Sequence, residues 1–120
     1  MMNAYLFVCS ANMLRSPTAE HVARSMGYSA DSAGSEPSYS PIRPLTVEAI
    51  DRAENIVCME QRHADAVLAL RPEAAGRIQV WNVPDDFDYC HPELVAWIKR
   101  CLPSRIYEPM RSALTQSDGR

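Results

Sequence analysis

A cysteine and an arginine stand six positions apart at the end of an apolar run. The run, residues 4–8 (AYLFV), leads into Cys9, and a polar loop then reaches Arg15, Ser16 and Pro17. Loop amides and the start of a helix attract anions, and a guanidinium can bind two oxyanion oxygens at once. The spacing therefore predicts a site for a tetrahedral oxyanion such as phosphate.

The same positive field favours the thiolate form of Cys9. A thiolate beneath a phosphoryl group can attack phosphorus and form a phosphocysteine, while Arg15 and the loop amides stabilise charge on the phosphoryl oxygens. The leaving oxygen needs a proton, which a carboxylic acid on a neighbouring loop can supply. The stretch VPDDFD offers Asp85, Asp86 and Asp88.

The rest of the chain must bring these two segments together. Hydrophobic patterning predicts strands at 4–8, 29–33, 55–59 and 77–81, with helices at 16–27, 46–53, 61–71 and 92–102 between and after them. This alternation predicts an α/β fold of three layers, a parallel sheet flanked by helices. Ligands bind beyond the carboxyl ends of such strands, and the loops 9–16, 33–41, 59–63 and 82–91 all follow a strand.

Capping residues and prolines indicate where the predicted helices and loops begin and end. Ser16 predicts the N-cap of the first helix, and Thr46 predicts the cap of the second, whose inner face would run to Ala53. Three prolines within 37–44 predict a loop without regular structure. Residues 1–103 are expected to form a single domain, and 104–120 a C-terminal extension with a disordered end.

The segment LFVCSANMLRSPTAE resembles the phosphate-binding loop of the low-molecular-weight protein tyrosine phosphatases, which carry the pattern C-x5-R-S-P. The stretches DSAG at 31–34 and IVCME at 56–60 are also similar to that family, as is the order of elements. The resemblance covers roughly residues 4–102, and VPDDFDYCHPELV is similar to a short bacterial branch of the family.

This resemblance implies a four-stranded sheet of order 2-1-3-4 and a role for each residue of the motif. Cys9 would be the nucleophile, Arg15 the phosphate ligand and Ser16 a hydroxyl donor to the thiolate. Asn12 would lock the loop with help from Ser32, and Asp85 would be the general acid. The phosphate loop and its supports would then be Ser10, Ala11, Asn12, Met13, Leu14, Ser16 and Ser32.

The sequence departs from the family pattern in three places. Leu14 stands where many members have a second cysteine that protects the first from oxidation. Asp86 stands where a proline is expected after the acid, so Asp86 stays open as an alternative to Asp85. The segment after DSAGS is short, and the aromatic candidates for a substrate pocket are Tyr39, Phe87 and Tyr89.

The remaining cysteines, and His63, are expected to lie outside the catalytic group. Cys58 and Cys101 are expected in the core, while Cys90 borders the acidic loop and could have a redox role. His63 is expected to face solvent, with a hydrogen bond to the phosphate loop as the alternative. Wide cysteine spacing predicts no disulfide framework. Since no two histidines have metal-ligand spacing, no metal and no cofactor are predicted.

Composition limits the partners. The net charge is −3 and no basic block occurs, which argues against nucleic acid as a partner. No segment approaches the roughly 20 apolar residues of a membrane helix, and the start is interpreted as a strand and not a signal peptide. A cytoplasmic protein without a membrane partner is therefore expected, and its oligomeric state stays open.

The leading interpretation is a metal-independent phosphatase acting on a phosphorylated protein or a small phosphate ester. An arsenate reductase would use the same oxyanion site but needs a resolving thiol, and Cys58 and Cys90 are 32 residues apart. A phosphocysteine carrier would need neither Arg15 nor an acid loop. A phosphate-binding module without significant turnover is the remaining alternative.

Overall fold

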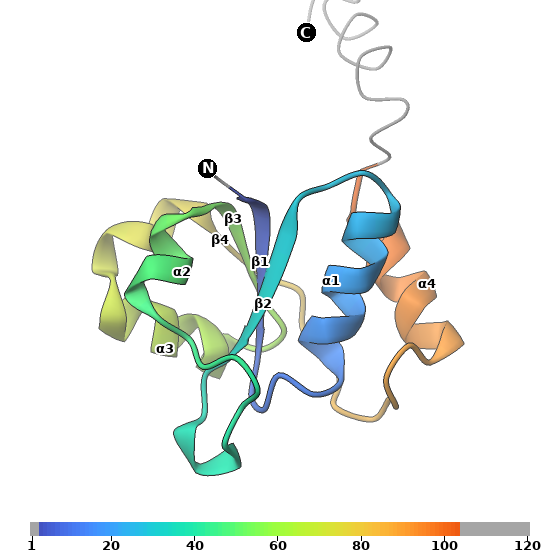
Figure 1. Ribbon diagram of the computed structural model, residues 1–120, viewed down its shortest axis with the longest axis horizontal. Helices are drawn as coiled ribbons and strands as arrows, with labels where there is room; N and C mark the ends of the chain where they lie inside the picture. Colours follow the sequence, from blue (N-terminus) through green and yellow to red (C-terminus); the bar gives the residue numbers. More distant parts are fainter. Residues whose placement is uncertain (1–2, 104–120) are drawn as a thin grey trace, which may run out of the picture.

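Four parallel strands form the centre of the protein (Figure 1). The computed structural model describes residues 3–103, so the extension predicted for 104–120 lies outside the described residues. Strands β1 (Asn3–Cys9), β2 (Ala30–Gly34), β3 (Ala53–Cys58) and β4 (Ile78–Val80) pair in the order β2-β1-β3-β4. The predicted α/β class and the strand order 2-1-3-4 are confirmed.

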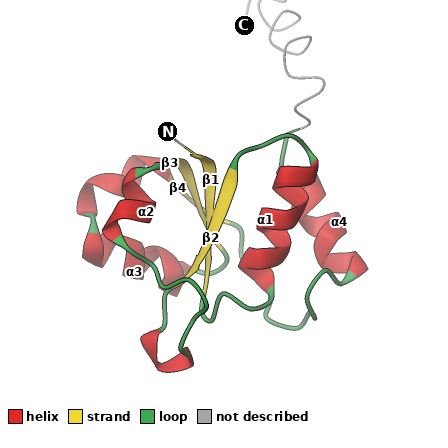
Figure 2. Cartoon of the chain, in the orientation of Figure 1, coloured by secondary structure: helices red, strands yellow, loops and turns green. Residues whose placement is uncertain are grey.

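Helices cover both faces of this sheet, which makes three layers (Figure 2). Helices α1 (Arg15–Ser25) and α4 (Pro92–Cys101) lie on one face, and α2 (Val47–Asp51) and α3 (Gln61–Leu70) on the other. Two 3-10 turns, η1 (Pro37–Tyr39) and η2 (Pro72–Arg77), complete the connections. In the described residues no helix is both long and apolar enough to cross a bilayer.

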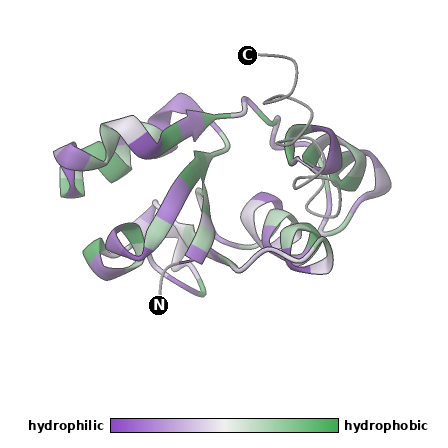
Figure 3. Ribbon diagram, turned by 90° about the horizontal axis from the view of Figure 1, so that it is seen from above, coloured by the Kyte–Doolittle hydropathy of each residue, from purple (hydrophilic) through white to green (hydrophobic). Residues whose placement is uncertain are grey.

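The apolar run of β1 explains why the sheet is covered twice. Tyr5 and Phe7 point into the core beneath α1 and α4, whereas Leu6 and Val8 point into the core beneath α2 and α3. Side chains alternate across a strand, so a continuous apolar run needs an apolar layer on each side. The helices carry both hydrophilic and hydrophobic residues (Figure 3), as expected of elements with one face on the sheet.

Three local predictions need correction. Helix α1 begins at Arg15 with Leu14 as its N-cap, so Ser16 lies inside the first turn and its hydroxyl is used elsewhere. Helix α2 ends at Asp51, and Ala53 already belongs to β3, where pairing with β1 replaces the helical turn. The proline-rich segment contains η1, because Pro37 suits the first position of such a turn.

The loops after β1, β2 and β4 meet at one end of the molecule, the lower edge in Figure 1. Each of these loops bends through a residue with a left-handed φ that is not glycine: Asn12, Ser40, Asn82 and Cys90. Such conformations cost about 1 kcal/mol and concentrate at functional sites. The left-handed backbone conformations of non-glycine residues thus lie at the edge of the sheet where the oxyanion site is predicted.

Candidate active site

A pocket of about 270 Å³ opens at this edge, and we call it the Cys9 pocket. It brings together residues from the loop after β1, the η1 turn and the loop after β4. Of the residues predicted from sequence, it is lined by Cys9, Ser10, Ala11, Met13, Leu14, Arg15, Tyr39 and Asp85.

The thiol of Cys9 is buried, with 3% of the residue exposed, at the end of β1. Its Sγ lies 2.9 Å from the hydroxyl oxygen of Ser16. Ser16 is fully buried in the first turn of α1. Its hydroxyl can therefore donate only to an acceptor inside the protein and not to bulk water. A thiolate at Cys9 would accept this proton, and that contact is the one the resemblance implies.

Asn12 fixes the loop that carries Cys9. Its side-chain Nδ2 donates to the hydroxyls of Ser16 (3.0 Å) and Ser32 (2.9 Å), and its Oδ1 accepts from the backbone N–H of Arg43 (3.1 Å). The backbone of Asn12 has a φ of 55°, a left-handed value that asparagine tolerates better than most residues. Three hydrogen bonds to three segments hold this turn in place.

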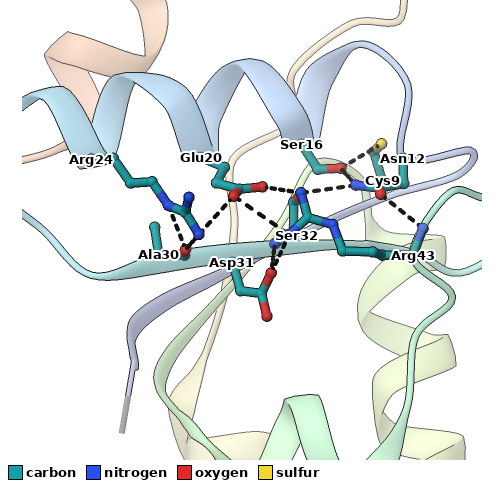
Figure 4. Close-up of polar contacts among 9 residues, drawn as sticks. All are labelled: Cys9, Asn12, Ser16, Glu20, Arg24, Ala30, Asp31, Ser32 and Arg43. Atoms are coloured by element: carbon teal, nitrogen blue, oxygen red, sulfur yellow. Dashed lines mark hydrogen bonds and ion pairs between the residues drawn. The ribbon is translucent and has the colours of Figure 1, made fainter. Parts of the chain in front are cut away.

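The network continues from Asn12 to a buried carboxylate (Figure 4). The Ser32 hydroxyl donates to Glu20, which is 7% exposed on α1. Glu20 also pairs with Arg43 (2.7 Å) and Arg24 (2.9 Å), and Arg43 reaches Asp31 at 2.6 Å. A buried carboxylate needs such partners, and here they join α1, β2 and the segment before α2 behind the Cys9 loop.

Arg15 is 2% exposed, which is unusual for a cation. Its Nη1 donates to Glu60 Oε2 at 2.6 Å and to the carbonyl of Val83 at 2.9 Å, and its Nε lies 3.5 Å from Asp85 Oδ1. The hydrogen bond from Arg15 holds the pKa of Glu60 below its ordinary value. Glu60 and Val83, which do not line the pocket, thus orient the guanidinium, and no hydrogen bond within residues 3–103 occupies its Nη2.

The acidic loop presents Asp85, and not Asp86, to the pocket. Asp85 lines the pocket beside Arg15, and its side chain is 56% exposed. Asp86 and Asp88 are exposed and do not line the pocket; the backbone carbonyl of Asp88 accepts from His91. This geometry favours Asp85 as the residue that can exchange a proton with a bound ligand.

Two of the three aromatic candidates lie elsewhere. Tyr39 lines the Cys9 pocket from η1. Phe87 packs partly buried against the core and against the ring of His91, with ring centroids 5.3 Å apart. Tyr89 borders a separate hollow beside Arg24 and Arg43. Tyr39 therefore stands with Met13 as an exposed side chain at the pocket mouth.

His63 does not face solvent, and this expectation was wrong. The ring is fully buried at the start of α3, and its Nε2 lies 2.9 Å from the hydroxyl of Ser10. The hydrogen bond to the Cys9 loop, weighed as the alternative, is the one observed. The physical reason is the capping box at the start of α3, in which His63 Nδ1 accepts from the backbone N–H of Glu60 and the ring is held inward against Ser10.

The other cysteines divide between core and surface. Cys58 is fully buried, and burial raises the pKa of its thiol to about 12. Cys101, predicted in the core, is exposed because it follows the buried stripe of α4 without belonging to it. Cys90 is half-buried, and its N–H donates to Thr18. All four thiols are free.

The described residues contain no group of side chains suited to bind a metal ion. Within residues 3–103 no three His, Cys, Asp or Glu side chains gather in a way that could hold a metal ion. Positive charge at the Cys9 pocket comes instead from Arg15 and from the N-terminus of α1, whose cap residue Leu14 makes no side-chain hydrogen bond.

Sequence reasoning missed Glu60, Glu20 and Arg43. Glu60 follows β3 at the same edge as Arg15, and a carboxylate in that position is a signal that could have been used. Glu20 and Arg43 gave no such signal, because a charged residue on a helix or in a loop is ordinarily solvated. Their pairing spans 23 residues and depends on the packing of α1 on β2.

Solved structures resemble this protein over most of its length. SP-PTP, a low molecular weight protein tyrosine phosphatase from Streptococcus pyogenes, matches with a TM-score of 0.68 and 18% identity over 88% of this chain and 97% of its own. The chain has the fold of the low-molecular-weight protein tyrosine phosphatases. No family model and no curated protein sequence matches the chain.

Two further structures share this phosphatase fold. YwlE arginine phosphatase from Geobacillus stearothermophilus has a TM-score of 0.65 and 21% identity, covering 95% of this chain and 96% of that one. Wzb from Vibrio vulnificus, in complex with benzylphosphonate, has a TM-score of 0.64 and 22% identity, covering 83% and 91%. The strand order of this chain is therefore that of the phosphatase fold.

Proposed function

We propose that this protein is a metal-independent phosphatase that hydrolyses a phosphomonoester through a phosphocysteine on Cys9. One observation carries the proposal: a nucleophile, a buried cation and a carboxylic acid, Cys9, Arg15 and Asp85, line the same pocket. Nucleophilic displacement at phosphorus needs these three groups around one point.

In the first step the Cys9 thiolate attacks phosphorus, and the bond from phosphorus to the leaving oxygen breaks. Asp85 in its acid form gives its proton to that oxygen, so the product leaves as an alcohol or phenol. Arg15 and the loop amides stabilise the charge on the three non-bridging oxygens. Ser16, 2.9 Å from Sγ, stabilises the thiolate before attack.

In the second step Asp85, now a carboxylate, takes a proton from water as the water oxygen attacks phosphorus. The sulfur–phosphorus bond breaks, inorganic phosphate leaves and the Cys9 thiolate returns. The exposed side of Asp85 suits this role because water can reach it, whereas Cys9 itself is buried.

The substrate is proposed to be a phosphorylated protein or a small phosphate ester, with an aryl ester such as phosphotyrosine favoured. The ligand named for the Vibrio structure, benzylphosphonate, carries an aromatic ring, and Tyr39 and Met13 offer apolar surface at the mouth of the Cys9 pocket. The name of the Geobacillus protein adds phosphoarginine to the compounds worth testing. Four free thiols favour a reducing compartment such as the cytoplasm.

Arsenate reduction is disfavoured because it requires a second reactive thiol. Cys58 is buried in β3 with a pKa raised to about 12, so it is not a nucleophile near neutral pH. Cys90 is half-buried in the acidic loop and does not line the Cys9 pocket.

The test is hydrolysis of a generic aryl phosphate in the presence of a metal chelator. Wild type is expected to turn over, and rapid quenching should trap labelled phosphate on the protein. Cys9→Ala should abolish both signals, and Arg15→Lys should reduce turnover by at least about a hundredfold. Cys101→Ser, which changes an exposed cysteine outside the pocket, is the matched control and should behave as wild type.

If wild type binds phosphate without turnover, the protein is a binding module and the enzyme proposal fails. Persistent labelling of Cys9→Ala would move the nucleophile to another residue.

A further inference from the structure

Ser10 lines the Cys9 pocket and carries a hydroxyl that the proposed reaction does not yet use. It directly follows Cys9, is 5% exposed and lines the pocket. Within residues 3–103 its hydroxyl oxygen has one side-chain partner, Nε2 of His63 at 2.9 Å. The direction of that hydrogen bond decides what the hydroxyl can offer to a ligand.

The other ring nitrogen of His63 settles this direction. Nδ1 accepts a hydrogen bond from the backbone N–H of Glu60 at 3.0 Å, so it carries no proton. A neutral imidazole then has its proton on Nε2. Nε2–H must donate to Ser10, whose oxygen acts as the acceptor. The proton of the Ser10 hydroxyl is consequently free for another acceptor.

The surroundings of His63 keep the ring neutral. Burial and the nearby cations Arg15 and Arg62 lower the pKa of His63 to about 4, against the smaller opposing effects of Glu60 and Asp85. The ring is fully buried. Near neutral pH the tautomer imposed by Glu60 is therefore the populated state.

We propose that His63 is a positioning residue that holds the Ser10 hydroxyl as a hydrogen-bond donor to the oxyanion in the Cys9 pocket. The inference rests on the proposed function, in which this pocket binds a phosphoryl group. His63 accepts the Glu60 N–H on one side and donates to Ser10 on the other, so Ser10 has one proton left and a nearby anion to receive it. The Ser10 hydroxyl thus adds a donor to those of Arg15 and the loop amides.

The experiment measures binding of inorganic phosphate by calorimetry for wild type, Ser10→Ala, His63→Asn and the double variant. An asparagine oxygen can take the place of Nδ1 and accept from Glu60, but the shorter side chain does not reach Ser10. Each single variant is expected to weaken phosphate binding about tenfold, the value of a hydrogen bond to a charged group. The double variant should be no weaker than Ser10→Ala, because His63 acts through Ser10.

Three measurements separate this role from simple loss of structure. Thermal unfolding checks that each variant is folded, and His21→Asn, an exposed histidine on α1, should leave phosphate binding unchanged. The ¹⁵N NMR spectrum of wild type should show a protonated Nε2 and a bare Nδ1 in His63. Should His63→Asn fail to fold, Ser10→Ala and the NMR spectrum still test the inference.

Wild-type phosphate affinity in Ser10→Ala, a protonated Nδ1, or a double variant weakened by the product of the single effects would each overturn the inference. Because calorimetry needs no turnover, a wild-type protein that binds phosphate but hydrolyses nothing would defeat the proposed function and leave this inference intact.

Discussion

Asp85 and Asp86 are neighbours in sequence, yet only one of them lines the Cys9 pocket. Asp85→Asn should lower kcat by about a hundredfold for esters with poor leaving groups, because general acid catalysis contributes roughly 10²–10⁴. For a nitrophenyl ester, whose leaving group needs little protonation, the loss in the first step should be smaller. Rapid-quench kinetics with both esters measures the difference.

Asp86→Asn is the matched control and should keep wild-type dependence on the leaving group. The reverse pattern, with Asp86→Asn impaired and Asp85→Asn normal, would reassign the acid by one residue.

The meeting of Cys9, Arg15 and Asp85 in one pocket could be predicted from sequence, because all three lie at or just beyond the carboxyl ends of strands in one parallel sheet. Cys9 and Arg15 share a short motif, and Asp85 lies at the same edge. His63 and Glu60 could not be placed in this way. Their contacts with Ser10 and Arg15 span 53 and 45 residues, and the direction of a side chain at a helix start depends on a turn that composition does not determine.

At the scale of elements, β2 ends against the Cys9 loop with no room for a side chain. A Cβ added at Gly34 would overlap Pro41 and lie 2.9 Å from the backbone oxygen of Ser10. Gly34→Ala should cost about 1–3 kcal/mol in the free energy of unfolding, because backbone cannot yield cheaply, and should also weaken phosphate binding. Chemical denaturation and calorimetry measure the two effects.

Gly76→Ala is the control, since a Cβ at Gly76 meets nothing within 4 Å. Equal effects of the two substitutions would show that the close approach at Gly34 does not govern the Cys9 loop.

The elements themselves were largely predictable, and their ends were not. Apolar runs indicated the strands that are buried on both faces, and helical periodicity indicated the helices with one buried face, because burial determines both patterns. The sequence predicts Ser16 as the cap, because a serine before a proline is typical of a helix start, whereas the cap in the structure is Leu14. In the structure the Ser16 hydroxyl lies within hydrogen-bond distance of the Cys9 thiol. This is a tertiary contact that no local sequence pattern predicts.

At the scale of the whole molecule, a buried neutral histidine makes stability depend on pH. The pKa of His63 falls from 6.5 to about 4 on folding. As pH falls below 6.5 the unfolded chain takes up a proton that the folded chain does not, so the unfolded state gains stability. The free energy of unfolding should therefore rise with pH between about 4 and 6.5.

Denaturant unfolding at several pH values measures this slope, and His63→Asn should flatten it. Glu60, whose pKa is lowered in the fold, acts at lower pH: its stabilisation is present above 4.5 and is lost as pH falls through its folded value. A slope between 5 and 6.5 that persists in His63→Asn would assign the effect to other groups.

The long sequence separations within the Cys9 pocket also bear on how the chain folds. Arg15 reaches Val83 across 68 residues, and Ser10 reaches His63 across 53. Such contacts carry a large entropy of loop closure and form after local ones. The helices and the shorter-range pairing of β1 with β2 can therefore precede a competent pocket. During refolding the recovery of helical signal should run ahead of the recovery of catalysis.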